Sequence, residues 1–483
     1  MNKKPLGEVV PSATLDGEQT ATHPGALMIF ANSLPGFKSF LGETARGCRD
    51  FGHVVAFVGC FLLPVARRSV LAAARGVRSD LRDAGNLLRF LGGSSSPAAL
   101  LTCAQRRLLA AAQGRRDRLH LLLLDSTQHT QHAASAENTF SRGNTTARTR
   151  KSSRKQKKHH KKSCHTFVFA LLLCPCGLRV PFWLPFYTQE YCQVRGWRHQ
   201  TQADLAAQLI TNLPLAEQVP VVVVGDTAFE AKQIRAACAK RHYHWVVPIN
   251  PERVLAGAKP RPKVLSLVEG LKAQDFQKTS FRLDQGDDAA MARVSKSRVR
   301  SSKHQRVYWV HRRTADVLSV GEVVLLFSNQ KEPPATTKGV SVQKVLMSDA
   351  HHASVEQLLH WYGLRWQVEL FFKEMKGELG MCQYRTGQFR RVEGWVNLCV
   401  LAFCYLEHRR SVWLRQGGKP QQPYWRAARA HALRAELRRQ TERADLTGLI
   451  RLAGTARGKR RLTKLLRSGY DDPSDPPARR GCV

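Results

Sequence analysis

The chain has 483 residues, of which 43% are hydrophobic and 8% aromatic, a composition typical of globular proteins that excludes global disorder. Its 76 Lys and Arg against 37 Asp and Glu give a formal charge of +39, whereas solubility requires a magnitude of only about 2 to 8 in a small domain. This excess favours a polyanionic partner, and nucleic acid is the first candidate.

The N-terminal quarter predicts two segments. Residues 1–26 are polar and aperiodic, which predicts a flexible leader. Residues 27–113 predict an all-helical unit, because helical patterns cover 51–75, 81–91 and 97–112. We assign this unit as a helical N-terminal, DNA-binding domain. A purely structural packing role remains equally open, since no helix-turn-helix pattern distinguishes the two.

Residues 114–410 predict an α/β domain. The apolar run Leu119–Leu124 ends at Asp125, and the run Val219–Val224 ends just before Gly225 and Asp226, as expected of strands buried on both faces. Strands and helices then alternate, which indicates a mixed sheet with covered faces. The further strands are expected at 166–173, 182–187 and 244–249, and the helices at 202–213 and 228–241.

Residues 254–349 interrupt this alternation and predict a β-rich insertion. Its short alternating stretches cover 279–283, 306–312, 322–327 and 343–347. Two strong helices are expected next, at 354–379 and 392–408. Residues 411–483 predict a basic helical C-terminal region with a disordered tail. Its basic stretch 426–443 fits contact with DNA or with a second subunit equally well.

The apolar runs are too short or too broken by Gly and Pro to span a bilayer, which takes roughly 20 residues. No transmembrane helix is therefore expected, and the polar N-terminus does not match a signal peptide. An anionic membrane surface is a weaker candidate partner, because the basic residues are spread through the whole chain.

Asp125 and Asp226 are both expected just past the carboxyl end of a buried strand, where ligands usually bind in α/β sheets. Taken alone, an Asp at the end of a strand is more often a helix cap or a turn residue. A compact group of Cys164, His165 and Cys174 with Cys176 could be read as a zinc site, but its spacing fits no usual pattern, and ordinary cysteines are the better interpretation.

The helix expected at 354–379 carries a polar stripe. Tyr362 is followed by Arg365, Glu369 and Lys376 at offsets of 3, 7 and 14 residues. At about 100° per residue, the four side chains lie within one sector of roughly 60°. A solvated helix face with an Arg365–Glu369 pair is the alternative, but it leaves Tyr362 and Lys376 unexplained.

The segment Tyr362–Lys376 resembles the Y-R-E-K signature of bacterial insertion-sequence DDE transposases of the cut-and-paste group, at every spacing. Asp125-Ser126-Thr127 resembles the segment around the first aspartate of that family, and Gly225–Phe229 the segment around the second. The resemblance covers about residues 115–410. It implies an RNase H-like catalytic core with a β-rich insertion ahead of the glutamate helix.

This resemblance implies a transposase that excises and integrates an insertion sequence by two-metal phosphoryl transfer. Asp125, Asp226 and Glu369 are then the catalytic residues and the metal ligands. Three carboxylates suit a hard cation, so the expected cofactor is Mg²⁺, with Mn²⁺ as a substitute and two ions per site. The expected partners are double-stranded DNA, namely inverted-repeat element ends and target DNA, and a second copy in a synaptic homodimer.

The resemblance also implies that Tyr362, Arg365 and Lys376 contact phosphates near the element end. Trp366 either stacks on the DNA end or is a core aromatic residue. The basic run 148–162 is expected to follow the DNA backbone, with a solvated loop as the alternative. Its DNA-binding residues are Arg148, Arg150, Lys151, Arg154, Lys155, Lys157, Lys158, Lys161 and Lys162.

Two other functions stay open for this sequence. One is a non-catalytic DNA-binding protein derived from a transposase, and the other is a nuclease on the same fold that does not join strands. In all three cases we expect a cytoplasmic protein associated with the nucleoid.

Overall fold

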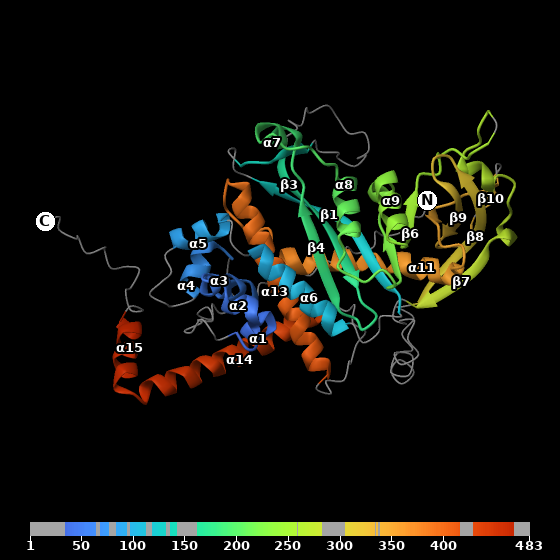
Figure 1. Cartoon of the computed structure of the whole chain (residues 1–483). Helices are drawn as coiled ribbons and strands as arrows, with labels where there is room; N and C mark the ends of the chain where they lie inside the picture. Colours follow the sequence, from blue (N-terminus) through green and yellow to red (C-terminus); the bar gives the residue numbers. More distant parts are fainter. Residues whose placement is uncertain are drawn as a thin grey trace, which may run out of the picture.

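The computed structural model describes most of the chain (Figure 1). In the described residues, no helix is both long enough and apolar enough to cross a membrane. The description covers residues 34–63, 68–76, 84–93, 97–112, 118–131, 136–142, 162–257, 259–282, 305–333, 335–336, 339–415 and 428–467.

Six helices precede the sheet in the part of the chain that the structure describes. The segment α6 has the same bounds as predicted, Pro97–Ala112. The helix α3 is buried along almost its whole length, and Phe57 and Phe61 pack edge-on against Trp395. These helices therefore share a core with the C-terminal half of the chain, and their role in DNA binding remains a prediction. The others are α1 (Phe37–Leu41), α2 (Glu43–Arg46), α3 (Phe51–Leu62), α4 (Val70–Gly76) and α5 (Ala84–Gly92).

The predicted mixed sheet is confirmed. Its strand order is β2-β3-β1-β5-β6-β12-β9-β8-β7, and β4 also pairs with β3. The pairs β1–β5 and β5–β6 are parallel, while β3 is antiparallel to β1 and to β4. This arrangement is consistent with an RNase H-like core. Its strands are β1 (His120–Gln131), β2 (Phe140–Arg142), β3 (Lys162–Leu173), β4 (Arg179–Pro185), β5 (Val221–Val224) and β6 (His244–Ile249).

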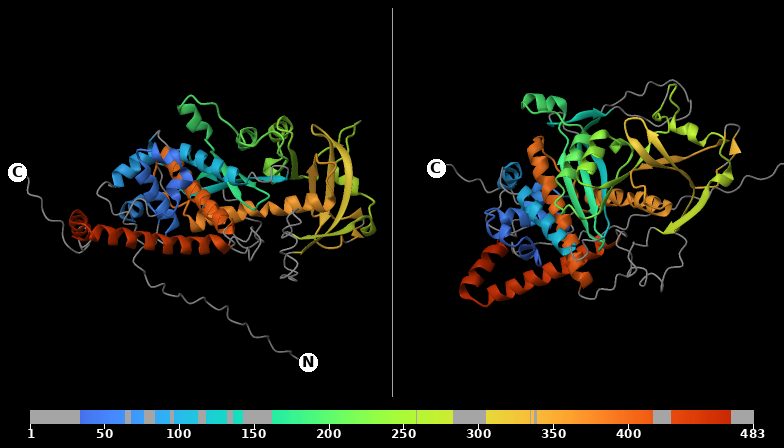
Figure 2. Two further views of the ribbon diagram at one scale, coloured as in Figure 1. Left: turned by 60° about the horizontal axis from the view of Figure 1, so that its bottom comes forward. Right: turned by 45° about the vertical axis from the view of Figure 1, so that its right-hand side comes forward.

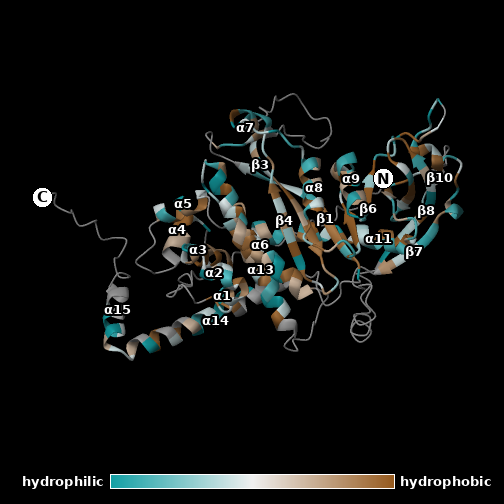
Figure 3. Cartoon of the chain, in the orientation of Figure 1, coloured by the Kyte–Doolittle hydropathy of each residue, from teal (hydrophilic) through white to brown (hydrophobic). Residues whose placement is uncertain are grey.

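The sheet is built from branched and aliphatic residues. All four residues of β5 are valines and all are buried, as expected of a strand covered on both faces. Figure 3 shows hydrophobic residues along the strands β1 and β4. The helices α8 (Gln202–Thr211) and α9 (Lys232–Lys240) pack against each other and against the sheet. Thr201 and Asp204 form a capping box at the start of α8, which satisfies exposed amides of the first turn.

The β-rich insertion extends the core sheet. Its strand β12 pairs with β6, with Val345 opposite Ile249, so the inserted strands continue the same hydrogen-bonded ladder (Figure 1). The sequence predicted the β-rich character but not this joining. The strands are β7 (Gln277–Arg282), β8 (Gln305–Val317), β9 (Gly321–Asn329) and β12 (Lys344–Ser348), and β10 (Ala335–Thr336) with β11 (Gly339–Val340) forms a separate pair.

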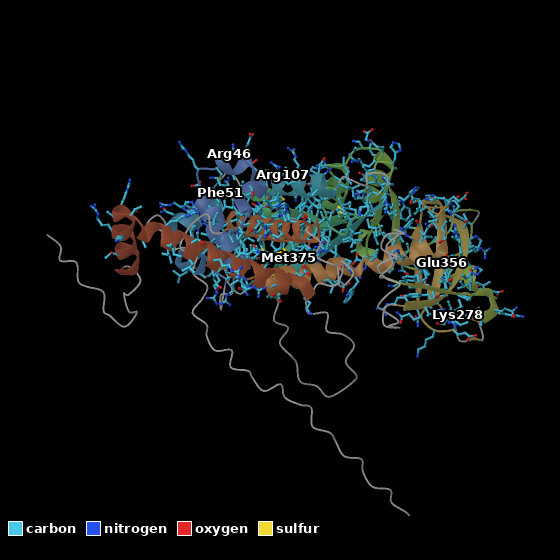
Figure 4. All side chains as sticks on the ribbon, turned by 90° about the horizontal axis from the view of Figure 1, so that it is seen from below. Arg46, Phe51, Arg107, Lys278, Glu356 and Met375 are labelled. Carbon is cyan, nitrogen blue, oxygen red and sulfur yellow. The ribbon has the colours of Figure 1, made fainter. Side chains whose placement is uncertain are left out.

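The helix predicted at 354–379 is a helical segment in three parts. Ser354 caps α11 (Val355–Leu364) in a capping box with Gln357, and α12 (Trp366–Lys373) follows through Arg365, whose backbone stays helical at φ −51 and ψ −33. A π-helical turn, Glu374–Glu378, ends the segment. In Figure 4, Glu356 lies beside the insertion and Met375 near the middle of the molecule, so this segment crosses from the insertion toward the N-terminal helices.

Three long helices complete the fold. The helix α13 (Phe389–Arg415) packs against α3, α5 and α6. Figure 2 shows α14 (Ala428–Ala453) running along the N-terminal helices, with α15 (Ala456–Arg467) at its far end. The side chain of Arg434 pairs with Glu378, which ties α14 to the π-helical turn. The predicted division into domains at 27–113, 114–410 and 411–483 remains a prediction.

Candidate active site

Asp125 lies in the middle of β1, not past its carboxyl end as the sequence predicted. The strand continues to Gln131 because β3 pairs with it along this whole length, with Asp125 opposite Phe169. A polar run can remain in a strand when its backbone groups are bonded to a neighbouring strand. Asp226, in contrast, follows the end of β5 at Val224, as predicted.

The register of the sheet places the two aspartates at one level. Leu123 of β1 lies opposite Val224 of the parallel strand β5, and each aspartate is two residues further on. The carboxylate of Asp125 accepts a hydrogen bond from the amide of Ser126 at 2.7 Å, and that of Asp226 accepts one from the amide of Ala228 at 2.9 Å. Backbone amides therefore orient both carboxylates.

Gly225 allows the turn that carries Asp226. A Cβ atom added at Gly225 would lie 2.8 Å from the Cβ of Phe229, closer than packed carbon atoms approach one another. Phe229 is fully enclosed in the core, so it has little freedom to move away. The chain therefore passes close to Phe229 at Gly225, which only glycine permits, and this turn places Asp226 at the end of β5.

Glu369 reaches the aspartates from α12. Phe371 and Phe372 pack edge-on against Phe169 of β3, each at 5.4 Å between ring centroids. Because paired residues of neighbouring strands point to the same face of a sheet, α12 covers the face toward which Asp125 points. The structure therefore brings together the three carboxylates that the sequence singled out.

The pKa of Asp125 reflects the proximity of the three carboxylates. Its pKa is raised to about 6, mainly by burial and in part by the charges of Asp226 and Glu369, while the Ser126 amide and Arg365 oppose the increase. Arg365 lies between two of the carboxylates, 2.7 Å from Glu369 and 3.6 Å from Asp125. The site thus holds three acidic side chains with one guanidinium among them.

The other residues of the polar stripe point to different neighbours. The ammonium of Lys376 donates to the carbonyl of Gln128 on β1 at 3.2 Å. The hydroxyl of Tyr362 accepts from Lys344 at 3.1 Å, and the same ammonium lies 4.8 Å from the centre of its ring. Lys344, at the start of β12, had no signal in the sequence that would have linked it to this site.

Trp366 is 57% exposed, which excludes the interpretation that it is a core aromatic residue. Residues 143–161 lie outside the described residues, and with them the predicted DNA contacts of the basic run 148–162 from Arg148 to Lys161. Lys162 is the first residue of β3.

His165, the histidine of the cysteine group, forms hydrogen bonds with other residues of the protein. Its Nδ1 is bonded to the hydroxyl of Tyr384 at 2.8 Å and its Nε2 to the carbonyl of Glu137 at 2.8 Å. Both ring nitrogens therefore have protein partners, which disfavours a zinc site at this position.

A buried ionic network, which the sequence did not reveal, supports the helical segment. Arg179, at the start of β4, binds Glu374 of the π-helical turn at 3.0 Å and Glu407 of α13 at 2.8 Å, and Arg410 also contacts Glu407. Burial opposes ionisation of Glu407, but Arg179 and Arg410 outweigh it and lower its pKa. The network fixes the turn that connects Glu369 with Lys376.

The donor set at the carboxylates fits a hard divalent cation, because it offers oxygen atoms only. The part of the chain that the structure describes contains no group of three His, Cys, Asp or Glu arranged tightly enough to hold one ion. Arg365 occupies the space between Asp125 and Glu369. A cation there requires this guanidinium to turn away from at least one of the two carboxylates.

The pH dependence of stability follows from the raised pKa of Asp125. Its carboxylate is ionised less readily in the folded protein than in the unfolded chain, so stability is lost as the pH rises from about 4 through 6. We expect Asp125→Asn to raise the free energy of unfolding by about 1 to 2 kcal/mol at pH 7 without metal, and to leave it unchanged at pH 3.5.

Urea unfolding in buffer with a chelator tests this effect. Asp316→Asn, on an exposed position of β8, is the matched control and should show no difference between the two pH values. A loss of stability in Asp125→Asn at pH 7 would contradict the expectation.

Residues 193–405 match the family model of the transposase DDE domain. The matched region contains Asp226 and the whole segment Tyr362–Lys376, while Asp125 lies before it. No curated protein matches the chain. The family match agrees with the resemblance found in the sequence, and membership of the Y-R-E-K subgroup remains a prediction.

Proposed function

Since the chain carries a transposase DDE domain related to those of insertion-sequence transposases, we propose that the protein excises an insertion sequence and integrates it into target DNA. The observation that most supports this proposal is the convergence of Asp125, Asp226 and Glu369. They come from two neighbouring strands and a helix, and the charges of the other two raise the pKa of Asp125. Their order along the chain is that of a DDE triad.

In this proposal, Asp125, Asp226 and Glu369 would hold two Mg²⁺ ions, with Mn²⁺ as a substitute. Such ions would supply positive charge to the attacking and leaving oxygens of a displacement at phosphorus. Burial and the neighbouring carboxylates raise the pKa of Asp125, which supports the assignment, because a bound cation favours the ionised carboxylate. Arg365 then acts as the residue that neutralises Asp125 and Glu369 before the metals bind.

The chain's own residues position the DNA. Tyr362, Arg365 and Lys376 contact phosphates near the element end, and the hydroxyl of Tyr362 also accepts a hydrogen bond from Lys344. The exposed indole of Trp366 packs on the DNA end, because an exposed aromatic face can stack on a base. The basic run 148–162 adds affinity along the backbone without reading sequence.

The same proposal covers the partners and the setting. The DNA is double-stranded, comprising two inverted-repeat ends and a target, and the protein acts as a homodimer that holds both ends in the bacterial nucleoid. The formal charge of +39 supports binding of long DNA, because neutralising phosphates releases counterions. Binding should therefore weaken steeply with salt.

The test uses a plasmid in which the DNA that flanks the gene on both sides surrounds a marker. Purified full-length protein with Mg²⁺ should release the marked segment and join its 3′ ends to a second plasmid. Breaks without joined products would indicate a nuclease on the same fold. Binding without breaks would indicate a non-catalytic DNA-binding protein, and either result overturns the proposal.

A further inference from the structure

A partly exposed aromatic cluster lies around α7 (Gln189–Val194), between β4 and α8. It consists of Tyr187, Tyr191 and Trp197, which we call the aromatic platform. The rings of Tyr187 and Tyr191 are parallel within 3° with centroids 5.6 Å apart, and Trp197 meets them edge-on at 5.3 and 6.2 Å. Trp197 is 50% exposed, so half of this large side chain faces solvent. Figure 1 shows α7 at one end of β3.

The platform is held rigidly from behind. The hydroxyl of Tyr187 donates to Glu393 of α13, and Phe389 meets both tyrosine rings at 5.8 Å. Gly196 adopts φ +65, a conformation that glycine reaches without strain. It lets the amide of Trp197 bond to the carbonyl of Cys192 at 2.9 Å. This hydrogen bond fixes the backbone that carries the indole. It does not by itself explain why half of the Trp197 side chain faces solvent.

Cationic side chains border the platform. The guanidinium of Arg195 stacks 3.5 Å from the centre of the Tyr191 ring and lies 5.9 Å from that of Trp197. Arg195 and Arg390 both act electrostatically on Glu393, which places both guanidinium groups near this carboxylate. A flat π face beside guanidinium groups offers the two interactions that a nucleotide accepts, stacking for the base and charge for the phosphate.

The register of the sheet places the platform near the carboxylates. The amide of Phe186, just before Tyr187, bonds to the carbonyl of Thr166, and Thr166 pairs with Gln128. The carbonyl of Gln128 binds Lys376, so Lys376 and the start of the platform lie at one level, two strands apart.

The platform also lies on the same face of the sheet as the carboxylates. Phe389, which supports the platform, stacks on Phe167 at 6.5 Å. Phe167 is two residues from Phe169, the strand partner of Asp125. Residues two apart on a strand share a face, so Asp125, Lys376 and the platform line one side of the molecule.

We propose that the aromatic platform binds an unpaired nucleobase of a DNA strand, stacked on Trp197, while Arg195 and Arg390 neutralise the adjacent phosphates. This inference rests on the proposed function, because it presumes that DNA lies across the carboxylates. The aromatic platform is a binding site outside the polar stripe. Its ligand is single-stranded DNA rather than duplex DNA. A DNA strand leaving the carboxylates past Lys376 can reach it along the same face.

The test measures the affinity of full-length protein for two probes at one salt concentration. One probe is a single-stranded oligothymidylate of about 16 nucleotides with a central 2-aminopurine, and the other is a blunt duplex. The fluorescent base is needed because the chain has nine Trp. Trp197→Ala should weaken single-strand binding about 5- to 100-fold, abolish the quenching of 2-aminopurine, and leave duplex binding unchanged.

Two further variants keep the test decisive if Trp197→Ala is poorly folded. Trp197→Phe retains a stacking ring and should keep most of the affinity, whereas Trp197→Met retains apolar volume without a ring and should lose it. Val194→Ala, at an 83% exposed position of the same helix, is the matched control and should bind like the unchanged protein.

The outcomes separate this inference from the proposed function. Equal weakening for both probes, or no weakening in Trp197→Met, overturns the platform alone, provided that the unchanged protein binds duplex DNA and cleaves it with Mg²⁺. Failure of the unchanged protein to bind or cleave any DNA overturns the proposed function instead.

Discussion

Glu369→Gln is expected to reduce Mg²⁺-dependent strand cleavage by at least about 10³-fold. Glutamine keeps the size of the side chain and an oxygen that can accept from Arg365, which now donates to Glu369 at 2.7 Å, so the helix α12 should not change. It removes the negative charge on which the proposed metal site depends. The affinity for duplex DNA should stay within about threefold, because phosphates are bound by cationic side chains.

The measurement is single-turnover cleavage of a DNA duplex carrying one element end, together with a binding titration of the same duplex. Glu356→Gln is the matched control, because Glu356 lies exposed in the first turn of α11 and contributes only about 0.3 to 1 kcal/mol to that helix. It should cleave at the unchanged rate. Cleavage by Glu369→Gln as fast as by the control would rule out the proposed mechanism.

Arg179→Met is expected to lower the free energy of unfolding by about 3 to 5 kcal/mol. Arg179 is 5% exposed and is the ion partner of both Glu374 and Glu407. Its removal leaves Glu374 buried without its cation and leaves Arg410 as the remaining cation beside Glu407. An unpaired buried carboxylate destabilises the folded protein, because no water is present to solvate its charge.

The sign of the pH effect follows from Glu407. Its pKa is lowered in the folded protein, so Glu407 contributes stability above the usual carboxyl pKa of about 4.3 and loses it as the pH falls through the lower folded value. Burial raises the pKa of Glu374 although Arg179 opposes this, so removal of Arg179 disfavours both ionised carboxylates. The difference between Arg179→Met and the unchanged protein should therefore shrink below about pH 4.

Urea unfolding at several pH values measures this difference. Arg438→Met removes an exposed pair with Glu442, one helical turn away, and should cost less than about 1 kcal/mol. If Arg179→Met costs no more than this control, the network does not stabilise the π-helical turn.

The helical segment illustrates how far a sequence can predict a site. Tyr362, Arg365 and Glu369 were expected on one face because side-chain direction repeats with the helical period, and Arg365 does bond to Glu369. The π-helical turn at Glu374–Glu378 was not expected. It depends on anchors outside the segment, Arg179 and Arg434, which local periodicity does not report.

Asp125 illustrates the opposite case. The end of the apolar run at Leu124 indicated the end of a strand, because hydrophobic pattern reports burial and not backbone pairing. The strand continues to Gln131 because β3 supplies hydrogen-bond partners beyond the apolar run.

The sequence by itself determined the charge of the chain, the buried strands, the β-rich insertion and the polar stripe from Tyr362 to Lys376. These are properties of composition and of short-range periodicity. Only the tertiary structure decided that Asp125, Asp226 and Glu369 converge, that β12 joins the insertion to β6, and that Arg179 supports the turn beside Glu369. Each of these contacts joins residues far apart in the chain, and strand register and side-chain packing, not local pattern, bring such residues together.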